Sequence, residues 1–154
     1  MTLHPMWVSG FVDGEGTFYV GINPNSTMTV GYQVLPEFRV VQHKRDIQLL
    51  FRLKKFFKAG VVRQNHDDRF ELRIRKLDVL SDVIIPFFED NPLQTKKKHD
   101  FLKFREIIAL MKQGQHLKNN GLVSIIDIAC QMNRSDKQKT MEIRDKLITR
   151  CDQG

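Results

Sequence analysis

Two acidic residues stand two positions apart in the segment Asp13-Gly14-Glu15-Gly16, directly after a run of apolar and small residues. The run has helical spacing and predicts a helix from about Pro5 to Val12, with proline in the first turn, where a missing N–H costs nothing. The two glycines can adopt positive φ, which predicts a sharp turn at the end of this helix. Carboxylates gathered at a partially negative helix C-terminus suit a hard cation such as Mg²⁺. A polar turn without a ligand is the alternative for so short a motif.

Alternating apolar and polar residues after this turn predict strands. Thr17 to Asn23 and Tyr32 to Val41 have the two-residue period of half-buried strands. Residues 61–64 and 69–75 repeat that period on either side of a polar turn, which predicts a hairpin. Apolar spacing of three and four residues predicts further helices, over residues 43–59, from 78 to a break near Pro86, and over 95–113, 122–132 and 135–148.

The order of these elements indicates an α+β domain. The first 113 residues read α-β-β-α-β-β-α-α, and the remainder is helical. Residues 114–121 hold glycines and asparagines without periodicity, which predicts a soft joint. We therefore predict a single domain over residues 1–154, with a core over 1–113 and a C-terminal helical extension over 114–154.

Arginine dominates the polar positions of the predicted strands. An antiparallel sheet commonly has a solvated face, but such a face usually mixes the two signs of charge. Arg, Gln and Asn carry the donors and acceptors that read base edges in a DNA major groove, where a β-ribbon fits. Groove contact is therefore favoured over a solvated face for the outward residues Gln33, Arg39, Arg63, Asn65, Arg69, Glu71, Arg73 and Arg75.

Composition narrows the class of partner. The chain has 154 residues, a formal net charge of +7 and a sequence pI near 9.6. This excess of Lys and Arg favours a polyanionic partner, nucleic acid before a membrane surface. No apolar run approaches the length of a membrane span, so we expect no membrane partner. The cysteines Cys130 and Cys151 form no C-x-x-C pair, which argues against a disulfide framework or a thiolate zinc site.

The segment Val8-Ser9-Gly10-Phe11-Val12-Asp13-Gly14-Glu15-Gly16 resembles the motif that names the LAGLIDADG homing endonucleases. The predicted element order is similar to that family's αββαββα core, and Pro92-Leu93-Gln94-Thr95-Lys96-Lys97-Lys98 is similar to a P-L-x-T-x-K segment of many members. The resemblance implies a four-stranded antiparallel, saddle-shaped sheet with helices on one side, plus C-terminal helices. It also implies a site-specific double-strand DNA endonuclease that hydrolyses phosphodiesters with a divalent metal ion.

The resemblance assigns the active-site roles. Glu15 matches the motif's final acid, which binds the metal in the family, and the backbone carbonyl of Gly14 is implied as a second ligand. Gln42 aligns with a polar residue that positions water, and Lys96 with the active-site lysine. Mg²⁺ is the implied metal, with Mn²⁺ or Ca²⁺ able to replace it for binding. Near Asp46 some members carry a basic residue, and which neighbouring cation replaces it here is left open.

The resemblance also implies two interfaces. One motif supplies one acid and one half-site, so two copies are needed to cut both strands of a long, near-palindromic duplex. The expected homodimer interface comprises Trp7, Val8, Ser9, Gly10, Val12 and Asp13. The expected DNA-binding residues are Tyr19, Asn23, Asn25, Gln33, Arg39, Arg63, Asn65, Arg69, Glu71, Arg73 and Arg75.

Two alternatives stay open on the same fold: an RNA-binding intron maturase and a DNA-binding protein that does not cleave. A basic chain without a targeting segment suits the bacterial cytoplasm, a mitochondrion or a plastid equally well. No feature of the sequence indicates a small-molecule substrate.

Overall fold

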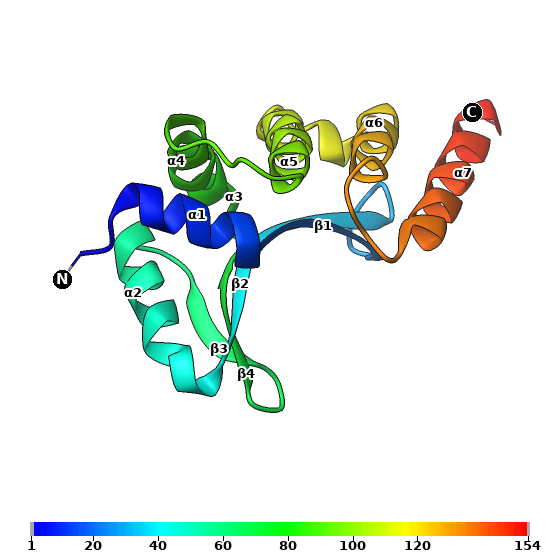
Figure 1. The fold of residues 1–154 in the computed structure, drawn as a ribbon. Coiled ribbons are helices and arrows are strands. Elements are labelled where there is room, and N and C mark those ends of the chain that lie inside the picture. Colours follow the sequence, from blue (N-terminus) through cyan, green and yellow to red (C-terminus); the bar gives the residue numbers. More distant parts are fainter. Residues whose placement is uncertain (1, 154) are drawn as a thin grey trace. The chain divides into compact units, whose positions relative to one another are not determined.

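Four strands form one antiparallel sheet in the order β1-β2-β4-β3 (Figure 1). The structure is a computed structural model that describes the backbone of residues 2–153 and the side chains of residues 2–150. The predicted α+β class and the four-stranded antiparallel sheet are confirmed. The strands are β1 (Gly16–Pro24), β2 (Tyr32–His43), β3 (Val61–His66) and β4 (Arg69–Ile74).

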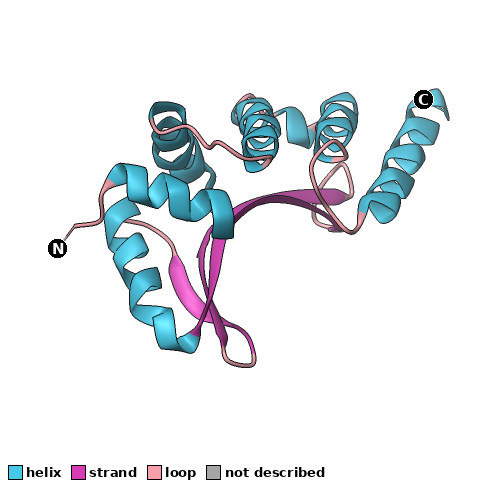
Figure 2. Ribbon diagram, viewed as in Figure 1, coloured by secondary structure: helices cyan, strands magenta, loops and turns pink. Residues whose placement is uncertain are grey.

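Helical segments occupy most of the remaining described chain (Figure 2). None of the described helices is both long and apolar enough to cross a membrane. The segments are α1 (Pro5–Glu15), the 3₁₀ turn η1 (Lys44–Asp46), α2 (Ile47–Phe57), α3 (Leu77–Val79), the π-helical segment η2 (Leu80–Ile84), α4 (Ile85–Asp90), α5 (Lys97–Lys112), the 3₁₀ turn η3 (Gln115–Leu117), α6 (Asn119–Ala129) and α7 (Lys137–Gln153).

The chain forms two compact units that are interleaved in the sequence. One unit consists of Met1–Phe18 and Glu37–Lys98, and the other of Tyr19–Pro36 and His99–Gly154. The boundaries fall inside β1, β2 and α5, so each of these elements contributes residues to both units. The predicted single domain, with a helical extension from residue 114, stays a prediction.

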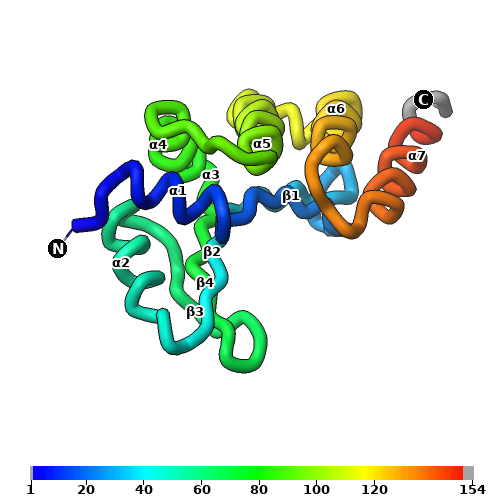
Figure 3. The backbone as a smooth tube through the Cα atoms, viewed as in Figure 1, coloured from blue at the N-terminus to red at the C-terminus, as the bar shows by residue number. Residues whose placement is uncertain are grey.

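In the first unit, α2 packs its apolar side on the β3–β4 hairpin, which Figure 3 shows as two adjacent backbone segments. Leu50 and Leu53 of α2 and Leu72 of β4 are fully buried. Phe38 of β2 lies among other rings, 5.9 Å from the centroid of Phe57. This core fixes which side of the hairpin faces outward, because side chains alternate along a strand.

In the second unit, α6 packs against α7. Leu122 and Ile125 of α6 and Leu147 of α7 are fully buried. An ion pair from Arg144 to Asp127 joins the two helices at their surface.

Several predicted boundaries are wrong. The helix predicted over 122–132 is α6 (Asn119–Ala129), and the soft joint predicted over 114–121 contains η3 and the start of α6. The first helix continues beyond Val12 to Glu15, and neither Gly14 nor Gly16 has positive φ. Gly14 is part of the helix and Gly16 is extended, with φ −86°. The break predicted near Pro86 is also wrong, because α4 runs through this residue. The π-helical turn η2 immediately precedes α4, and a wider turn of this kind accommodates a residue that has no N–H to donate.

Candidate active site and nucleic-acid interface

The junction between α1 and β1 is so tight that it requires glycine at position 16. A Cβ on Gly16 would lie 2.6 Å from Cγ1 of Val12 and 3.0 Å from the Val12 carbonyl oxygen. The Gly16 N–H donates to that same carbonyl. The chain therefore passes from helix into strand without a loop, and Glu15 occupies the last turn of α1.

Glu15 presents an exposed carboxylate at this helix end. Its one hydrogen bond among the described residues comes from Nε2 of Gln42 at 3.5 Å, which is long for such a bond. Gln42 lies near the end of β2 and also donates to the Val41 carbonyl at 2.9 Å. The structure thus brings Glu15 and Gln42 together, as the predicted roles require, and leaves most of the Glu15 carboxylate available to a ligand.

A lysine reaches the same point from the start of α5. Nζ of Lys97 donates to the carbonyl oxygen of Gly16, and the Lys97 side chain is half-buried. Lys96 is exposed, and within the part of the chain that the structure describes its side chain makes no hydrogen bond or ion pair. The structure therefore brings Lys97, and not the predicted Lys96, to the residue that follows Glu15.

Asp13 fixes the segment that carries this lysine. Its carboxylate accepts from the Gln94 N–H at 2.8 Å, the Thr95 N–H at 3.1 Å and the Thr95 hydroxyl at 2.6 Å. Desolvation raises the pKa of Asp13, but these bonds and the charge of Lys97 outweigh it, so the pKa lies below its ordinary value. Asp13 thus holds a loop of its own chain and is the anchor of the turn before α5.

The predicted dimer residues lie on two sides of α1. Val8, Ser9 and Val12 are buried within their own unit, and the Ser9 hydroxyl donates to the Asn91 carbonyl at 2.7 Å. Trp7 is 46% exposed and stacks on Phe11 with ring centroids 5.1 Å apart.

Gly10 is also exposed, and a Cβ placed on it would meet no atom within 4 Å. The outer side of α1 is therefore an exposed stripe of apolar and small residues, comprising Met6, Trp7, Gly10 and Gly14.

The residues at the end of α1 fit a metal ion only in part. Across the described residues, no group of three His, Cys, Asp or Glu side chains could hold a metal ion. Glu15 supplies one exposed carboxylate. The carbonyl of Gly14 belongs to the last helical turn, where carbonyls lack partners within the helix. One chain thus offers two of the oxygen ligands that an octahedral Mg²⁺ site needs.

The predicted DNA-binding arginines share the outer face of the first unit's strands, opposite α2 and the core. In the β2–β4 register Arg39 stands opposite Arg73, and in the β3–β4 register Arg63 stands opposite Glu71. Arg69 is exposed at the start of β4. The structure therefore brings these residues to one surface, as predicted.

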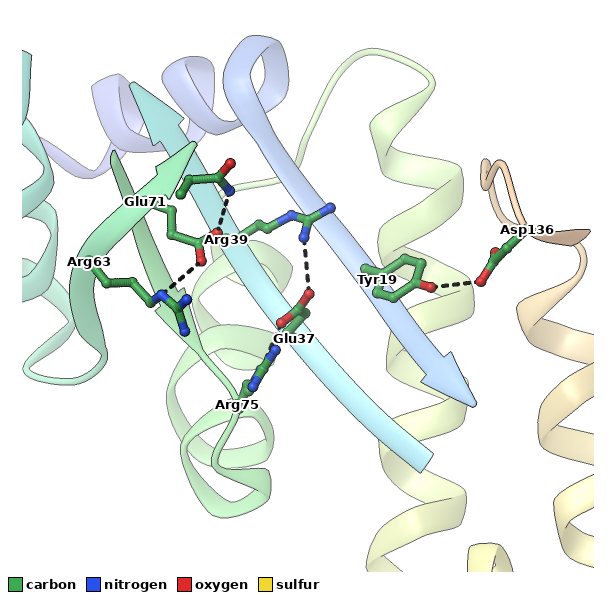
Figure 4. Close-up of polar contacts among 8 residues, drawn as sticks. Tyr19, Glu37, Arg39, Arg63, Glu71, Arg75 and Asp136 are labelled. Carbon is green, nitrogen blue, oxygen red and sulfur yellow. Dashed lines mark hydrogen bonds and ion pairs between the residues drawn. The ribbon is translucent and has the colours of Figure 1, made fainter. Parts of the chain in front are cut away.

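Two carboxylates lie buried within this arginine face (Figure 4). Glu37 lies on the same side of β2 as Arg39 and is covered by Arg39 and Arg75, which bond its two oxygens at 3.1 and 2.8 Å. Glu71 is covered in the same way by Asn65 at 3.0 Å and Arg63 at 3.7 Å.

Arg73 lies amid the other charges of this face. Desolvation lowers its pKa, and the positive charges of Arg75 and Arg63 lower it further, while Glu71 and Glu37 oppose that shift only in part. The face carries more arginines than acids, so it is positive overall, as binding to a polyanion requires.

The predicted DNA-binding residues of the second unit have mixed surroundings. Asn23 and Gln33 are exposed, and Nδ2 of Asn25 lies 3.4 Å from Oε1 of Gln33. The Tyr19 hydroxyl instead donates to Asp136 at 2.8 Å, as Figure 4 shows. The structure therefore leaves the amides accessible and occupies the Tyr19 hydroxyl with a carboxylate.

Asp136 also holds a buried arginine. Arg134 donates to its two oxygens at 2.6 and 3.1 Å. The hydrogen bond from Arg134 is the largest cause that lowers the pKa of Asp136 to about 2, and the Tyr19 hydroxyl adds to it. Burial and the bond to this carboxylate raise the pKa of Tyr19.

Sequence reasoning missed Lys97, Glu37 and Asp136 as residues of the site and its supports. The signal for Lys97 was present, because the P-L-x-T-x-K pattern that begins at Pro92 places its lysine at position 97. For Glu37 the sequence offered one neighbour on the same strand face, Arg39, while its second partner, Arg75, comes from a distant part of the chain.

The matched family profile is described as LAGLIDADG endonuclease and covers residues 8–108. Among solved structures, the homing endonuclease I-TnaI is 56% identical, with a TM-score of 0.91, and the alignment covers 96% of this chain and 99% of that chain. A structure of I-SmaMI bound to cleaved DNA is 32% identical, with a TM-score of 0.90, over 95% of this chain and 49% of that one.

Curated relatives are longer. A probable intron-encoded endonuclease of Neurospora crassa is 36% identical over 79% of this chain, and an uncharacterized 50.9 kDa protein in an ND4 intron of Podospora anserina is 30% identical over 75%. The chain spans 26% of the length of each of these two relatives.

Proposed function

Because this chain belongs to the LAGLIDADG endonuclease family, we propose that it is a site-specific endonuclease that cuts both strands of a long, near-palindromic DNA duplex. The observation that carries the proposal is the convergence of Glu15, Gln42 and Lys97 at the end of α1. An open carboxylate, a polar amide and a cation at one point are groups suited to phosphodiester hydrolysis.

Glu15 and the Gly14 carbonyl are the proposed ligands of a divalent cation, with Mg²⁺ as the working ion. Such a cation, when bound, would supply a Lewis acid for the scissile phosphate and lower the pKa of nearby water. A related protein, I-SmaMI, has been solved on uncleaved DNA in the presence of calcium ions. This precedent supports a divalent metal, and Mg²⁺ follows from the hard oxygen ligands.

The chain's own side chains orient and stabilise the reaction. Gln42 steadies the Glu15 carboxylate from β2 and presents an amide to water beside it. Lys97 places a positive charge on the Gly16 carbonyl side of the site, where it would stabilise negative charge on a phosphate. We assign the active-site lysine role to Lys97 because Lys96 has no comparable contact within the described chain.

The arginine face is the proposed DNA-binding surface. Phosphate contacts fix the position of the duplex, and base-edge contacts give sequence preference. A DNA-bound structure of I-SmaMI, with its TM-score of 0.90, supports a DNA partner for this fold. The proposed contacts are Asn23, Asn25, Gln33, Arg39, Arg63, Asn65, Arg69, Arg73 and Arg75.

A second copy of the chain is the proposed partner at α1. The sequence holds one motif, and one chain offers one open carboxylate at the motif's end. Trp7 and Gly10 lie on the exposed side of α1 and can contact a facing helix. Pairing two such helices would bring the two copies of Glu15 together, and a shared cation would offset the repulsion between them.

Several relatives are described as intron-encoded. We propose that this chain is likewise a product of a mobile intron, for which a long target site is needed so that cuts in a genome are few.

The test is cleavage of a library. Purified protein is incubated with near-palindromic duplexes and Mg²⁺, and the cut ends are sequenced. A single enriched site, cut on both strands, is the expected result. Glu15→Gln and an EDTA-treated sample serve as controls that should leave the library intact. Failure of the folded wild-type protein to cut any site would refute the endonuclease proposal.

The dimer is tested separately by sedimentation at micromolar protein. Wild-type protein should sediment as a dimer, and Gly10→Leu should shift it toward monomer because the added side chain stands where a facing helix would pack. A monomeric wild-type protein that cuts both strands would contradict the shared site.

A further inference from the structure

Glu37 and Glu71 occupy equivalent situations on the arginine face, and each gives its two oxygens to different donors. We call Glu37 with Arg39 and Arg75 the Glu37 cluster, and Glu71 with Arg63 and Asn65 the Glu71 cluster. In the first, Arg39 Nη1 bonds Oε1 at 3.1 Å and Arg75 Nε bonds Oε2 at 2.8 Å. In the second, Asn65 Nδ2 bonds Oε2 at 3.0 Å and Arg63 Nε lies 3.7 Å from Oε1.

Exposure within the clusters is unequal. The side chains of Glu37 and Glu71 are 6% and 7% exposed, whereas those of Arg39, Arg75 and Arg63 are 35%, 40% and 49% exposed. In an ordinary surface ion pair both partners lie in water. Here the acid is the buried partner and the arginines are the exposed ones. Figure 4 shows Glu37 between its two arginines.

This arrangement is costly for a DNA-binding surface. Burying a carboxylate forfeits its hydration, and a negative charge beneath the surface weakens attraction to phosphate. Neither effect serves affinity. The benefit lies in geometry, because a guanidinium has five N–H donors and each arginine of the Glu37 cluster uses one of them on the acid in these bonds. The bond from Arg75 uses its Nε, so the two Nη groups of Arg75 are not spent on Glu37.

A held arginine loses less rotamer freedom when it binds. Arginine side chains are long and flexible, and freezing one at an interface opposes binding. An acid that holds Nε or Nη1 before DNA binds also fixes the direction of the other N–H donors, because the guanidinium is planar and rigid. Glu71 also fixes the side-chain amide of Asn65, by accepting a hydrogen bond from Nδ2. The Asn65 oxygen Oδ1 takes no part in this bond.

We propose that Glu37 and Glu71 are positioning residues for base readout, an inference that rests on the proposed function. Glu37 orients Arg39 and Arg75 toward guanines, because guanidinium pairs bidentately with guanine O6 and N7. Glu71 orients Arg63 toward guanine and Asn65 toward adenine, since a carboxamide pairs with adenine N6 and N7. In this proposal the acids do not contact bases themselves. Glu71, predicted as a direct DNA contact, is therefore proposed as a positioning residue.

The test compares sequence preference with overall affinity. Wild-type protein, Glu37→Gln and Glu71→Gln are each used to select bound duplexes from a randomised near-palindromic library in Ca²⁺, so that binding is read without cutting. Asp82→Asn is the matched control, because Asp82 is an exposed acid of the first unit. Its side chain makes no ion pair or hydrogen bond with the described residues. It removes the same charge without touching a guanidinium of the arginine face.

We expect Glu37→Gln to lower discrimination roughly tenfold at a few purine positions of each half-site. Those positions should be the ones that Arg39→Ala and Arg75→Ala also relax. Glu71→Gln should relax a different set, shared with Arg63→Ala and Asn65→Ala. Affinity for random duplex should be unchanged or higher, because a negative charge has been removed.

Three results would overturn the inference. An unchanged preference in both Gln variants means that the acids do not position the readers. A uniform loss at all positions means that they only stabilise the sheet. Absence of any preferred sequence for the wild-type protein refutes the proposed function itself and removes base readout with it, so the two failures are distinguishable.

A second variant and a measurement on the wild-type protein keep the inference testable if Glu37→Gln or Glu71→Gln does not fold. Glu37→Asp keeps the charge but withdraws it by one methylene, and should relax the same positions as Glu37→Gln. In the free wild-type protein, the Nε–H of Arg75 should exchange with solvent more slowly than that of exposed Arg69, which makes no ion pair among the described residues. Equal exchange rates would show that Glu37 does not hold Arg75.

Discussion

The end of α1 and the outer face of the strands both contain carboxylates, but the two regions treat them in opposite ways. Glu15 is exposed and receives one long contact, from Gln42 at 3.5 Å. Glu37 and Glu71 are buried. Glu37 accepts hydrogen bonds from Arg39 and Arg75, and Glu71 accepts one from Asn65 and forms an ion pair with Arg63. The acid that we propose as a metal ligand is left open. An acid that arranges the chain's own cations is enclosed by them.

The contrast recurs within α1 itself. Asp13 and Glu15 lie on the same helix two positions apart, yet Asp13 accepts hydrogen bonds from Gln94 and Thr95. The structure thus leaves one acid of the motif open, the proposed metal ligand, and engages the other as an anchor. Four substitutions sharpen or break this distinction, and they follow in order of expected effect.

Glu15→Gln should have the largest effect and should act on catalysis alone. We expect cleavage in Mg²⁺ to fall by roughly 10³-fold or more, because the lost ligand weakens a metal that supplies several kcal/mol of transition-state stabilisation. Thermal stability should hardly change, since the carboxylate makes one weak contact. Single-turnover cleavage and thermal melting measure the two. A variant that cleaves at the wild-type rate would remove Glu15 from the site.

Lys97→Ala should lower cleavage by roughly 10²-fold, a usual cost of removing one electrostatic stabiliser. Lys96→Ala is the matched control, because it removes the same charge from the neighbouring position. The Lys96 side chain makes no hydrogen bond or ion pair with the described chain, whereas Lys97 bonds the Gly16 carbonyl. It should cut within about twofold of wild type at equal DNA saturation. Equal loss in both variants would mean that the lysines serve only DNA affinity.

Asp13→Asn should instead reduce stability, by about 1–2 kcal/mol, because hydrogen bonds to a charged acceptor are replaced by weaker ones. The pKa of Asp13 is lowered in the folded protein, so the contribution of the charge is present above the ordinary carboxyl pKa and is lost as the pH falls. Denaturant unfolding at pH 7 and at pH 3 measures it, and the gap between variant and wild type should narrow at the lower pH. A gap that widens on acidification would contradict the anchor role.

Asp136→Asn should have the smallest effect, about 1 kcal/mol, since the acid is one-third exposed and solvent screens its pairs. Its pKa is about 2 in the folded protein against an ordinary 3.8. The stabilisation is therefore complete above pH 3.8 and is lost as the pH falls through about 2. Unfolding at stepped pH should show the variant and the wild type converging in that window. A variant as stable as wild type at pH 7 would rule out the enclosed-acid role here.

Much of the fold could be predicted from local pattern. The alternation at Phe70, Leu72 and Ile74 places these residues on the core side of β4, and the structure buries Leu72 and Ile74. Helix ends were less predictable. Glycine at position 14 favours a turn by itself, but the helix gains hydrogen bonds by continuing to Glu15, and Gly16 is needed for close packing on Val12 rather than for positive φ.

The candidate site was predicted in outline and not in register. The sequence placed Glu15 after the helix and arginines on one face of the strands, because both follow from periodicity and a motif. The prediction named Lys96, whereas the P-L-x-T-x-K pattern ends on Lys97. The structure brings Lys97 to the Gly16 carbonyl, at the start of α5 and just after the Asp13 bonds to Gln94 and Thr95.

The sequence by itself determined which residue types this protein offers: an acid at a helix end, an arginine-rich strand face, and one motif. These follow from local spacing, which a chain carries before it folds. Only the tertiary structure decided which acids are open and which are enclosed, because enclosure depends on partners distant in the chain, such as Arg75 for Glu37 and Thr95 for Asp13. The physical reason is that a hydrogen bond needs its donor and its acceptor close together in space. Local spacing in the sequence does not reveal which distant residue folding brings to a given acid.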